Sequence, residues 1–206
     1  DKYMEITLND AYWSNNIKLS AEDVVFAWKR LLKSSNDFAA ASLLFDIKNA
    51  RAVKEGDISI DDLGVEAVEI DVVKVIFEGD IDTDQFLLNL TSVATAPLYE
   101  NYVSKNADWA KKPSTMVTSG PFKLGKINYK DVTDEKDAPI KVRDDYAIDA
   151  NGNVKPETGY NVKEINYFYL ERNVYYYRDV QRDPIDESVT PYRILVDCTM
   201  SDEDIL

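Results

Sequence analysis

The sequence predicts a protein of the α+β class (mixed α/β), with helices and strands combined in its first half and mostly strands in its second half. Three observations lead to this prediction. Apolar residues recur at helical spacing after Ser20, a β-branched run covers residues 72–77, and short strand-like segments alternate with polar loops from Pro113 onward. The fold is therefore expected to contain at least one sheet and several short helices.

The first elements are a strand and an amphipathic helix. Alternation over Tyr3 to Leu8 predicts a strand. Ser20 can cap a helix whose first turn carries Glu22 and Asp23, where acids favour the helix dipole. The apolar stripe expected on this helix comprises Val24, Val25, Trp28, Leu31 and Leu32.

Further elements are predicted from turn-forming residues and from runs of β-branched residues. A second helix is predicted over residues 40–54, ending at Gly56, and strands over 65–70 and 72–77. Helices are also expected over residues 85–90 and 98–105 and at the start of 201–206. The strands predicted in the second half cover residues 120–126, 140–143, 165–170 and 192–198, with exposed loops at 131–139 and 149–158.

Composition excludes several function classes. The 206 residues carry 24 basic and 38 acidic side chains, a net charge of −14, which argues against binding to nucleic acid. The chain has no histidine, which removes catalytic triads, histidine-ligated metals and the usual general base. Its single cysteine, Cys198, is expected to be a buried, inert thiol. Carboxylate-only chemistry, such as a glycosidase pair or a magnesium site, stays open.

The ends of the chain and its apolar runs bear on location. No run approaches the roughly 20 apolar residues of a membrane-spanning helix. No basic-then-apolar leader opens the sequence, so we expect either an intracellular protein or a signal sequence outside this chain. The chain opens directly on a strand-like segment, which suggests a piece of a longer protein.

Aromatic and acidic clusters have two interpretations each. Tyr167, Phe168 and Tyr169 can stack on a ligand, or they can alternate between the two faces of a strand as packing residues, which we favour. Residues 149–153 have some character of a calcium loop but lack the later glutamate, and ordinary turn residues explain them better.

An ordered series of motifs resembles the family 5 extracellular solute-binding proteins. Residues 13–30, WSNNIKLSAEDVVFAWKR, resemble the family segment WSDG-x-x-[VL]-[TS]-A-x-D-[VF]-V-[YF]-[AS]-W-x-R. IKNA at 47–50, LGVEA at 63–67 and VTSGPFKL at 117–124 follow in the family's order. Asn15 and Asn16 stand where the family has Asp-Gly, and Ser119 where it has Asn or Thr.

The resemblance implies part of a clamshell like that of the periplasmic binding proteins, whose two lobes close on a solute. Residues 1–99 would form the extra α/β domain of lobe one and residues 100–206 part of its core sheet, with the second lobe absent. The resemblance places Phe38 where relatives carry an aromatic that faces the ligand, although packing at a helix start is an alternative. Ser119 and Gly120 are the other candidate ligand-binding residues, through their backbone. Trp13 and Trp28 are expected to form the fold instead.

The same resemblance implies a function in transport. The protein would capture an oligopeptide or other small solute outside the cytoplasm, in the periplasm or lipid-anchored at the cell membrane, and deliver it to the permease of an ABC importer. It would be a monomer, need no cofactor or metal, bind no nucleic acid and catalyse no reaction. The alternatives are a carboxylate-based hydrolase and a solute-binding fold reused as a sensor, adhesin or chaperone-like protein.

Overall fold

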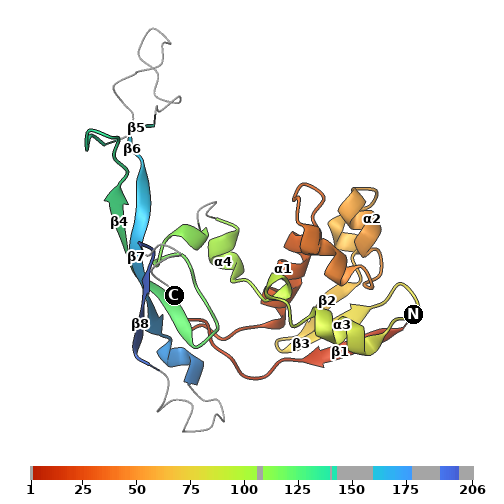
Figure 1. Ribbon diagram of the computed structural model, residues 1–206. Coiled ribbons are helices and arrows are strands. Elements are labelled where there is room, and N and C mark those ends of the chain that lie inside the picture. The colour runs from red at the N-terminus through yellow and green to blue at the C-terminus, as the bar shows by residue number, and fades with distance from the viewer. Residues whose placement is uncertain (1, 106–108, 140, 143–159, 178–190, 200–206) are drawn as a thin grey trace, which may run out of the picture. The chain divides into compact units, whose positions relative to one another are not determined.

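A computed structural model of the chain describes residues 2–105, 109–139, 141–142, 160–177 and 191–199. The chain divides into two compact units, which we call unit 1 (Asp1–Lys123 with Asn173–Thr190) and unit 2 (Leu124–Arg172 with Pro191–Leu206). Figure 1 colours both by residue number. The boundary predicted between residues 99 and 100 falls inside unit 1. The assignment of the two predicted parts to one lobe stays a prediction.

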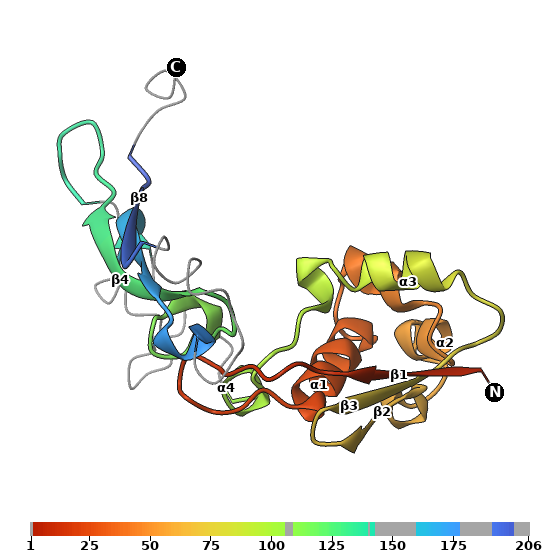
Figure 2. The ribbon, with the colours of Figure 1, turned by 90° about the horizontal axis from the view of Figure 1, so that it is seen from below.

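Unit 1 is built on a three-stranded antiparallel sheet in the order β1-β3-β2. Its strands are β1 (Tyr3–Thr7), β2 (Val65–Glu69) and β3 (Val72–Ile76). Helices α1 and α2 lie on one face of this sheet (Figures 1 and 2), and Val73 and Val75 of β3 are fully buried. β-Branched side chains at alternate positions of the central strand thus supply the sheet's half of the core.

Helix α1 (Ala21–Leu32) confirms the amphipathic helix predicted after Ser20. All five residues of the predicted apolar stripe are buried. At its N-terminus the Asp23 carboxylate accepts a hydrogen bond from the backbone N–H of Ser20 at 3.0 Å. This bond satisfies a donor at a helix end that would otherwise lack a partner.

The turn before α1 accommodates Asn15 and Asn16, which stand at the Asp-Gly position of the motif that the sequence resembles. Asn16 has a φ of 70°, in the left-handed region that favours glycine. Asparagine is the residue that enters this region most readily after glycine. The Asn15 side chain accepts the Ile17 N–H at 3.2 Å, which holds the turn.

The prediction of a single helix over residues 40–54 is wrong, because the chain forms two short helices there. The 3-10 helix η1 (Ala39–Leu44) and helix α2 (Ala50–Glu55) are separated by a segment that pairs with the end of β3. Lys48 donates its N–H to the Ile76 carbonyl at 2.8 Å, and Asn49 has a φ of 67°. Tertiary pairing therefore overrides helix propensity at this point. The predicted stop at Gly56 is confirmed by its φ of 88°.

The remaining helices of unit 1 are short. The α-helices are α3 (Thr83–Asn89) and α4 (Glu100–Val103), and the 3-10 helices are η2 (Ile60–Asp62), η3 (Val93–Thr95), η4 (Trp109–Lys111) and η6 (Val174–Tyr177). Phe86 of α3 is fully buried, and its ring centre lies 5.1 Å from that of Phe77 with the two rings nearly perpendicular. Among the described residues, no helix has both the length and the apolar character to cross a membrane.

Two tryptophans form the fold, as predicted. Trp13 and Trp28 are 2% and 3% exposed. Trp13 Nε1 donates to the Asp23 carboxylate at 3.0 Å, and Trp28 Nε1 donates to the Thr95 carbonyl at 2.8 Å. Both indole N–H groups are thus satisfied inside the core.

Unit 2 contains a three-stranded sheet in the order β4-β7-β8. Its strands are β4 (Phe122–Asp131), β7 (Lys163–Arg172) and β8 (Arg193–Asp197), and a separate antiparallel pair is formed by β5 (Lys141–Val142) and β6 (Tyr160–Asn161). The rings of Tyr167 and Tyr169 lie 5.7 Å apart, which confirms that they share one face of β7.

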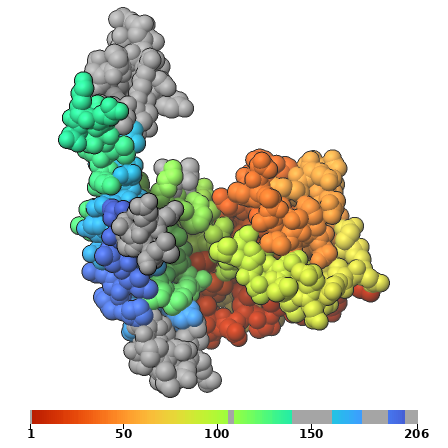
Figure 3. Space-filling view, viewed as in Figure 1, coloured from red at the N-terminus to blue at the C-terminus, as the bar shows by residue number. Residues whose placement is uncertain are grey.

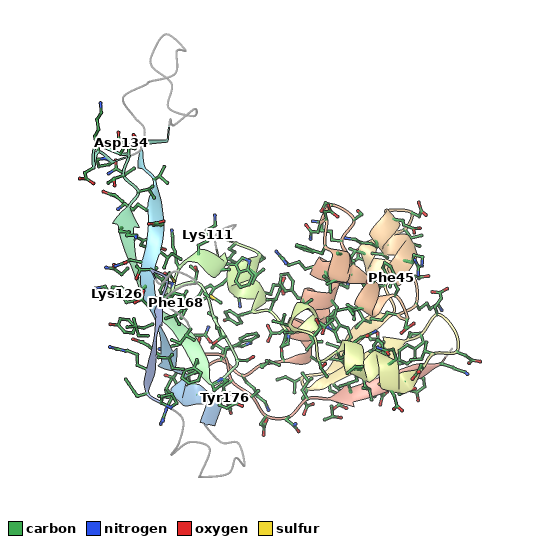
Figure 4. All side chains as sticks on the ribbon, viewed as in Figure 1. Phe45, Lys111, Lys126, Asp134, Phe168 and Tyr176 are labelled. Carbon is green, nitrogen blue, oxygen red and sulfur yellow. The ribbon has the colours of Figure 1, made fainter. Side chains whose placement is uncertain are left out.

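The loop predicted at residues 131–139 is confirmed. Asp134 (labelled in Figure 4) accepts the N–H groups of Lys136 at 2.8 Å and Ala138 at 3.0 Å. An aspartate that bonds to its own downstream backbone is a common turn device. The predictions for 149–158 and 201–206 lie outside the described residues.

The prediction of a buried Cys198 is wrong, since this residue is exposed. It follows the end of β8, an edge strand paired on one side with β7. Its N–H still donates to the Asn166 carbonyl of β7 at 3.0 Å, but its side chain is not enclosed by the described part of the sheet. The apolar sequence before it predicted the strand correctly but not its exposure.

We expect Thr199 to hold the Asp197 carboxyl in its ionised form. The Thr199 hydroxyl donates to Asp197 Oδ1 at 2.6 Å and its N–H at 2.8 Å, and these bonds lower the pKa of Asp197. Thr199→Val removes the hydroxyl, so this pKa should rise towards its ordinary value, as measured by NMR titration. A folded-state pKa below the unfolded one stabilises at higher pH, and the contribution is lost as pH falls through the folded value. An unchanged titration in Thr199→Val would contradict the assignment.

Candidate ligand-binding site

Phe38 lies at the start of η1, on the surface of unit 1. It occupies the position before the first helical residue, with extended backbone (φ −109°, ψ 109°). Its side chain is 36% exposed, so it is not a fully packed core residue. The structure thus leaves part of the ring available to a partner, and whether it meets a ligand stays a prediction.

The exposed part of Phe38 lies in an open hollow of about 370 Å³, which we call the Phe38 hollow. Three separate stretches of unit 1 build it: the end of α1, the start of η1 and the segment from η3 to η4. Its lining residues are Arg30, Leu31, Asp37, Phe38, Ala39, Ala40, Val93, Ala94, Ala96, Leu98 and Trp109. Small-molecule sites commonly have a volume of this order and a mostly apolar lining.

Val93 is the most exposed apolar residue of this lining, at 90%. The Ser92 hydroxyl accepts the N–H of Ala94 at 3.3 Å, and this turn presents the Val93 side chain outward. Figure 3 shows the segment from α3 through η3 at the surface in this view. An isopropyl group held outward beside a partly exposed ring favours contact with an apolar partner.

The Phe38 hollow contains one side chain of each charge. The Arg30 guanidinium lies 5.3 Å from the centre of the Phe38 ring, within the range of a cation–π interaction. Asp37 supplies the opposite charge on the same lining. The hollow can therefore bury an apolar group and also meet an amino or carboxylate group. Among the described residues no cluster of three or more His, Cys, Asp or Glu side chains could hold a metal ion.

Ser119 and Gly120 lie in a backbone segment that is fixed on both sides. The buried Asn173 side chain donates to the Gly120 carbonyl at 2.9 Å, and its N–H donates to the Pro121 carbonyl at 2.8 Å. Ser14 donates its N–H to the Thr118 carbonyl at 2.7 Å. No hydrogen bond within the described part of the chain uses the N–H groups of Ser119 or Gly120. Within the described residues these two amides are unused donors, on a segment held by hydrogen bonds at Thr118, Gly120 and Pro121.

The structure does not bring the three predicted site residues into one hollow. Ser119 and Gly120 are absent from the lining of the Phe38 hollow. Sequence reasoning also missed Val93 and Leu98 as partners of Phe38. The signal for Val93 was weak, a serine-capped turn before the Ala96–Pro97 pair.

Solved structures identify the fold as that of a bacterial solute-binding protein. The structure titled "Listeria monocytogenes OppA bound to peptide" matches with a TM-score of 0.64 over 95% of this chain and 30% of that chain, at 20% sequence identity. Identity at this level shows the fold alone. The structural match confirms the predicted mixed α/β fold and shows that this chain corresponds to only part of a clamshell structure.

The chain belongs to the bacterial extracellular solute-binding proteins, family 5, whose middle region matches residues 1–186. The oligopeptide-binding protein OppA of Bacillus subtilis is 32% identical over 126 residues, which are 60% of this chain and 23% of OppA. The periplasmic murein peptide-binding protein MppA of Escherichia coli is 31% identical over 122 residues, 57% of this chain and 22% of MppA. The chain thus spans less than a quarter of these relatives, and the predicted family is confirmed.

Proposed function

We propose that this protein captures oligopeptides outside the cytoplasm as the solute-binding subunit of an ABC importer. The observation that carries the proposal is the partly exposed Phe38 ring in an apolar hollow of about 370 Å³. It is supported by the names of similar family members, which describe them as peptide-binding proteins. The protein would be a monomer without a cofactor, held in the periplasm or by a lipid anchor, and would pass its solute unchanged to a permease.

A peptide matches the chemistry of both candidate regions. The Phe38 hollow offers apolar contact for a side chain, with Arg30 and Asp37 beside it for terminal charges. The amides of Ser119 and Gly120 can donate to peptide carbonyls, which are strong acceptors. A solute that contacts both lobes of a clamshell more favourably in the closed state shifts the protein towards closure. The 206-residue chain alone is expected to bind peptides weakly, because closure needs the second lobe.

The gene product in full, with and without Phe38→Ala, and the 206-residue chain are screened by thermal melting. The ligands are pools of di- to hexapeptides and unrelated solutes. We expect a rise of several degrees with peptides for the gene product in full. Phe38→Ala should weaken peptide binding about tenfold, because it removes a stacking surface worth on the order of 1.4 kcal/mol.

Phe45→Ala is the matched control. Phe45 also carries a guanidinium over its ring, that of Arg51 at 4.4 Å, but it does not line the Phe38 hollow. Peptide affinity should survive this change, measured relative to each variant's own ligand-free melting temperature. Equal losses in both variants would refute the role of Phe38. No response of the unchanged protein to any peptide pool would refute the peptide assignment and favour a sensor, an adhesin or another solute.

A further inference from the structure

A second hollow in unit 1 lies between α1 and α4. It has a volume of about 460 Å³, and we call it the basic hollow. Its lining comprises Phe26, Lys29, Arg30, Lys33, Asn36, Ile60, Val103 and Ser104. All of these residues belong to unit 1, and Arg30 is the one residue it shares with the lining of the Phe38 hollow.

The charge of this lining opposes that of the chain. Three of its side chains are cationic and none is acidic, although the whole chain has a net charge of −14. Lys29 forms an ion pair with Asp61 at 3.6 Å, and that aspartate side chain is 85% exposed. An ion pair so open to water is weak, so it leaves much of the ammonium charge available.

The favourable interaction of cations with the C-terminal end of a helix explains only part of this positive charge. Lys29 and Arg30 lie in its last turn, where positive charge favours the helix dipole. Lys33 lies beyond the helix as its C-cap residue. A helix end also needs no cavity around its charges. Stabilisation of the helix therefore accounts for some of the charge but not for the hollow that the three cations share.

The other polar groups of the basic hollow are already engaged as donors. Asn36 Nδ2 donates to the Arg30 carbonyl at 2.8 Å, and the Ser104 hydroxyl donates to the Glu100 carbonyl at 2.7 Å. The three cationic side chains are thus the lining groups best placed to donate to a ligand, and their strongest hydrogen bonds are with acceptors that carry negative charge. Apolar surface is supplied by Phe26, Ile60 and Val103.

We propose that the basic hollow binds a small amphipathic anion, a carboxylate, sulfate or phosphate group on a compact apolar body. The anionic group would lie among Lys29, Arg30 and Lys33, and the apolar body would lie against Phe26, Ile60 and Val103. This site shares Arg30 with the Phe38 hollow, but the proposal does not depend on peptide binding. A bound anion would compete with the Phe38 ring for the Arg30 guanidinium, which lies 5.3 Å from that ring.

The experiment uses phenyl phosphate as the probe and benzyl alcohol as its neutral counterpart. The ¹⁵N-labelled 206-residue chain is titrated in a chloride buffer of constant ionic strength, free of phosphate. We expect phenyl phosphate to shift the amide resonances of residues 29–33 and 103–104 with a dissociation constant on the order of 1 mM, as a ligand of this size permits. Benzyl alcohol should leave these resonances in place. Phenylacetate as a third probe separates a preference for phosphate from a general affinity for oxyanions.

The double variant Lys29→Gln/Lys33→Gln should weaken phenyl phosphate binding about tenfold or more, since charge-assisted hydrogen bonds are lost. Lys2→Gln/Lys18→Gln removes the same charge at exposed ion pairs with Asp80 and Asp10, outside the basic hollow, and should leave the affinity unchanged. Equal weakening in both double variants, or shifts of the unchanged chain that spread evenly over its surface, would overturn the proposal. Because the shifts are mapped on the unchanged chain, the test holds even if a variant fails to fold.

Discussion

Trp28→Ala is expected to lower the free energy of unfolding of unit 1 by about 3–5 kcal/mol, the usual cost of truncating a buried aromatic side chain. Trp28 is 3% exposed and lies in the middle of α1. Its indole N–H donates at 2.8 Å to the carbonyl of Thr95, a residue 67 positions later that is itself buried. The side chain therefore fills the core and also attaches η3 to α1.

A second substitution distinguishes the contribution of core packing from that of the hydrogen bond to Thr95. Trp28→Phe keeps much of the apolar volume but leaves the Thr95 carbonyl without its donor, so a loss of about 1–3 kcal/mol is expected. Chemical denaturation followed by far-UV circular dichroism measures both variants without relying on tryptophan fluorescence.

Trp109→Ala is the control for this prediction, because Trp109 is only half-buried in the lining of the Phe38 hollow. Its truncation should cost less than that of Trp28, about 1–2 kcal/mol, because a partly exposed side chain loses less packed surface than a fully buried one. A similar loss in Trp28→Ala and Trp109→Ala would contradict the distinction between a tryptophan that forms the fold and one that lines a surface hollow.

The sequence predicted local elements best where several local signals agreed. The stripe of α1 combines helical spacing, an N-terminal capping residue and acids in the first turn, and all these signals agree. β3 combines β-branching with an alternating buried pattern. By contrast, residues 47–49 carry no local sign of the pairing with Ile76 and Phe77 that interrupts the predicted helix. That interaction exists only once the sheet has formed.

The candidate site was less predictable for the same reason. Phe38 was found through its position in a family pattern, not through its chemistry. The Phe38 hollow depends on Leu31, Val93 and Trp109, which are far apart in sequence and meet only in the folded unit. The segment that carries Ser119 and Gly120 is anchored by Asn173, more than fifty positions later, and no local pattern in the sequence indicates that contact.

The second large effect is expected from Asp23→Ala, with a loss of about 2–4 kcal/mol in the free energy of unfolding. Asp23 is 8% exposed, and its carboxylate accepts the indole N–H of Trp13 and the backbone N–H of Ser20, both at 3.0 Å. Alanine would leave a buried donor without a partner and would remove a stabilising bond at the start of α1. The carbonyl of Asp23 also accepts the Leu98 N–H at 3.3 Å, a backbone bond that the substitution retains.

Asp23→Asn tests whether geometry or charge gives Asp23 its role. An asparagine oxygen can occupy the acceptor position of Oδ2, so this variant should lose less than half as much stability as Asp23→Ala, measured by the same denaturation. If both variants lose equally, the negative charge matters more than the acceptor.

A double-mutant cycle with Trp13→Phe then isolates the buried bond. Trp13→Phe removes the indole donor, so Asp23→Ala should cost about 1 kcal/mol less in that background than in the unchanged chain. Additive losses would show that the 3.0 Å contact between Trp13 Nε1 and Asp23 contributes nothing to stability. The expected coupling would instead explain why the resemblance to the family preserves both the tryptophan at position 13 and the aspartate at position 23: each residue satisfies the buried polar group of the other.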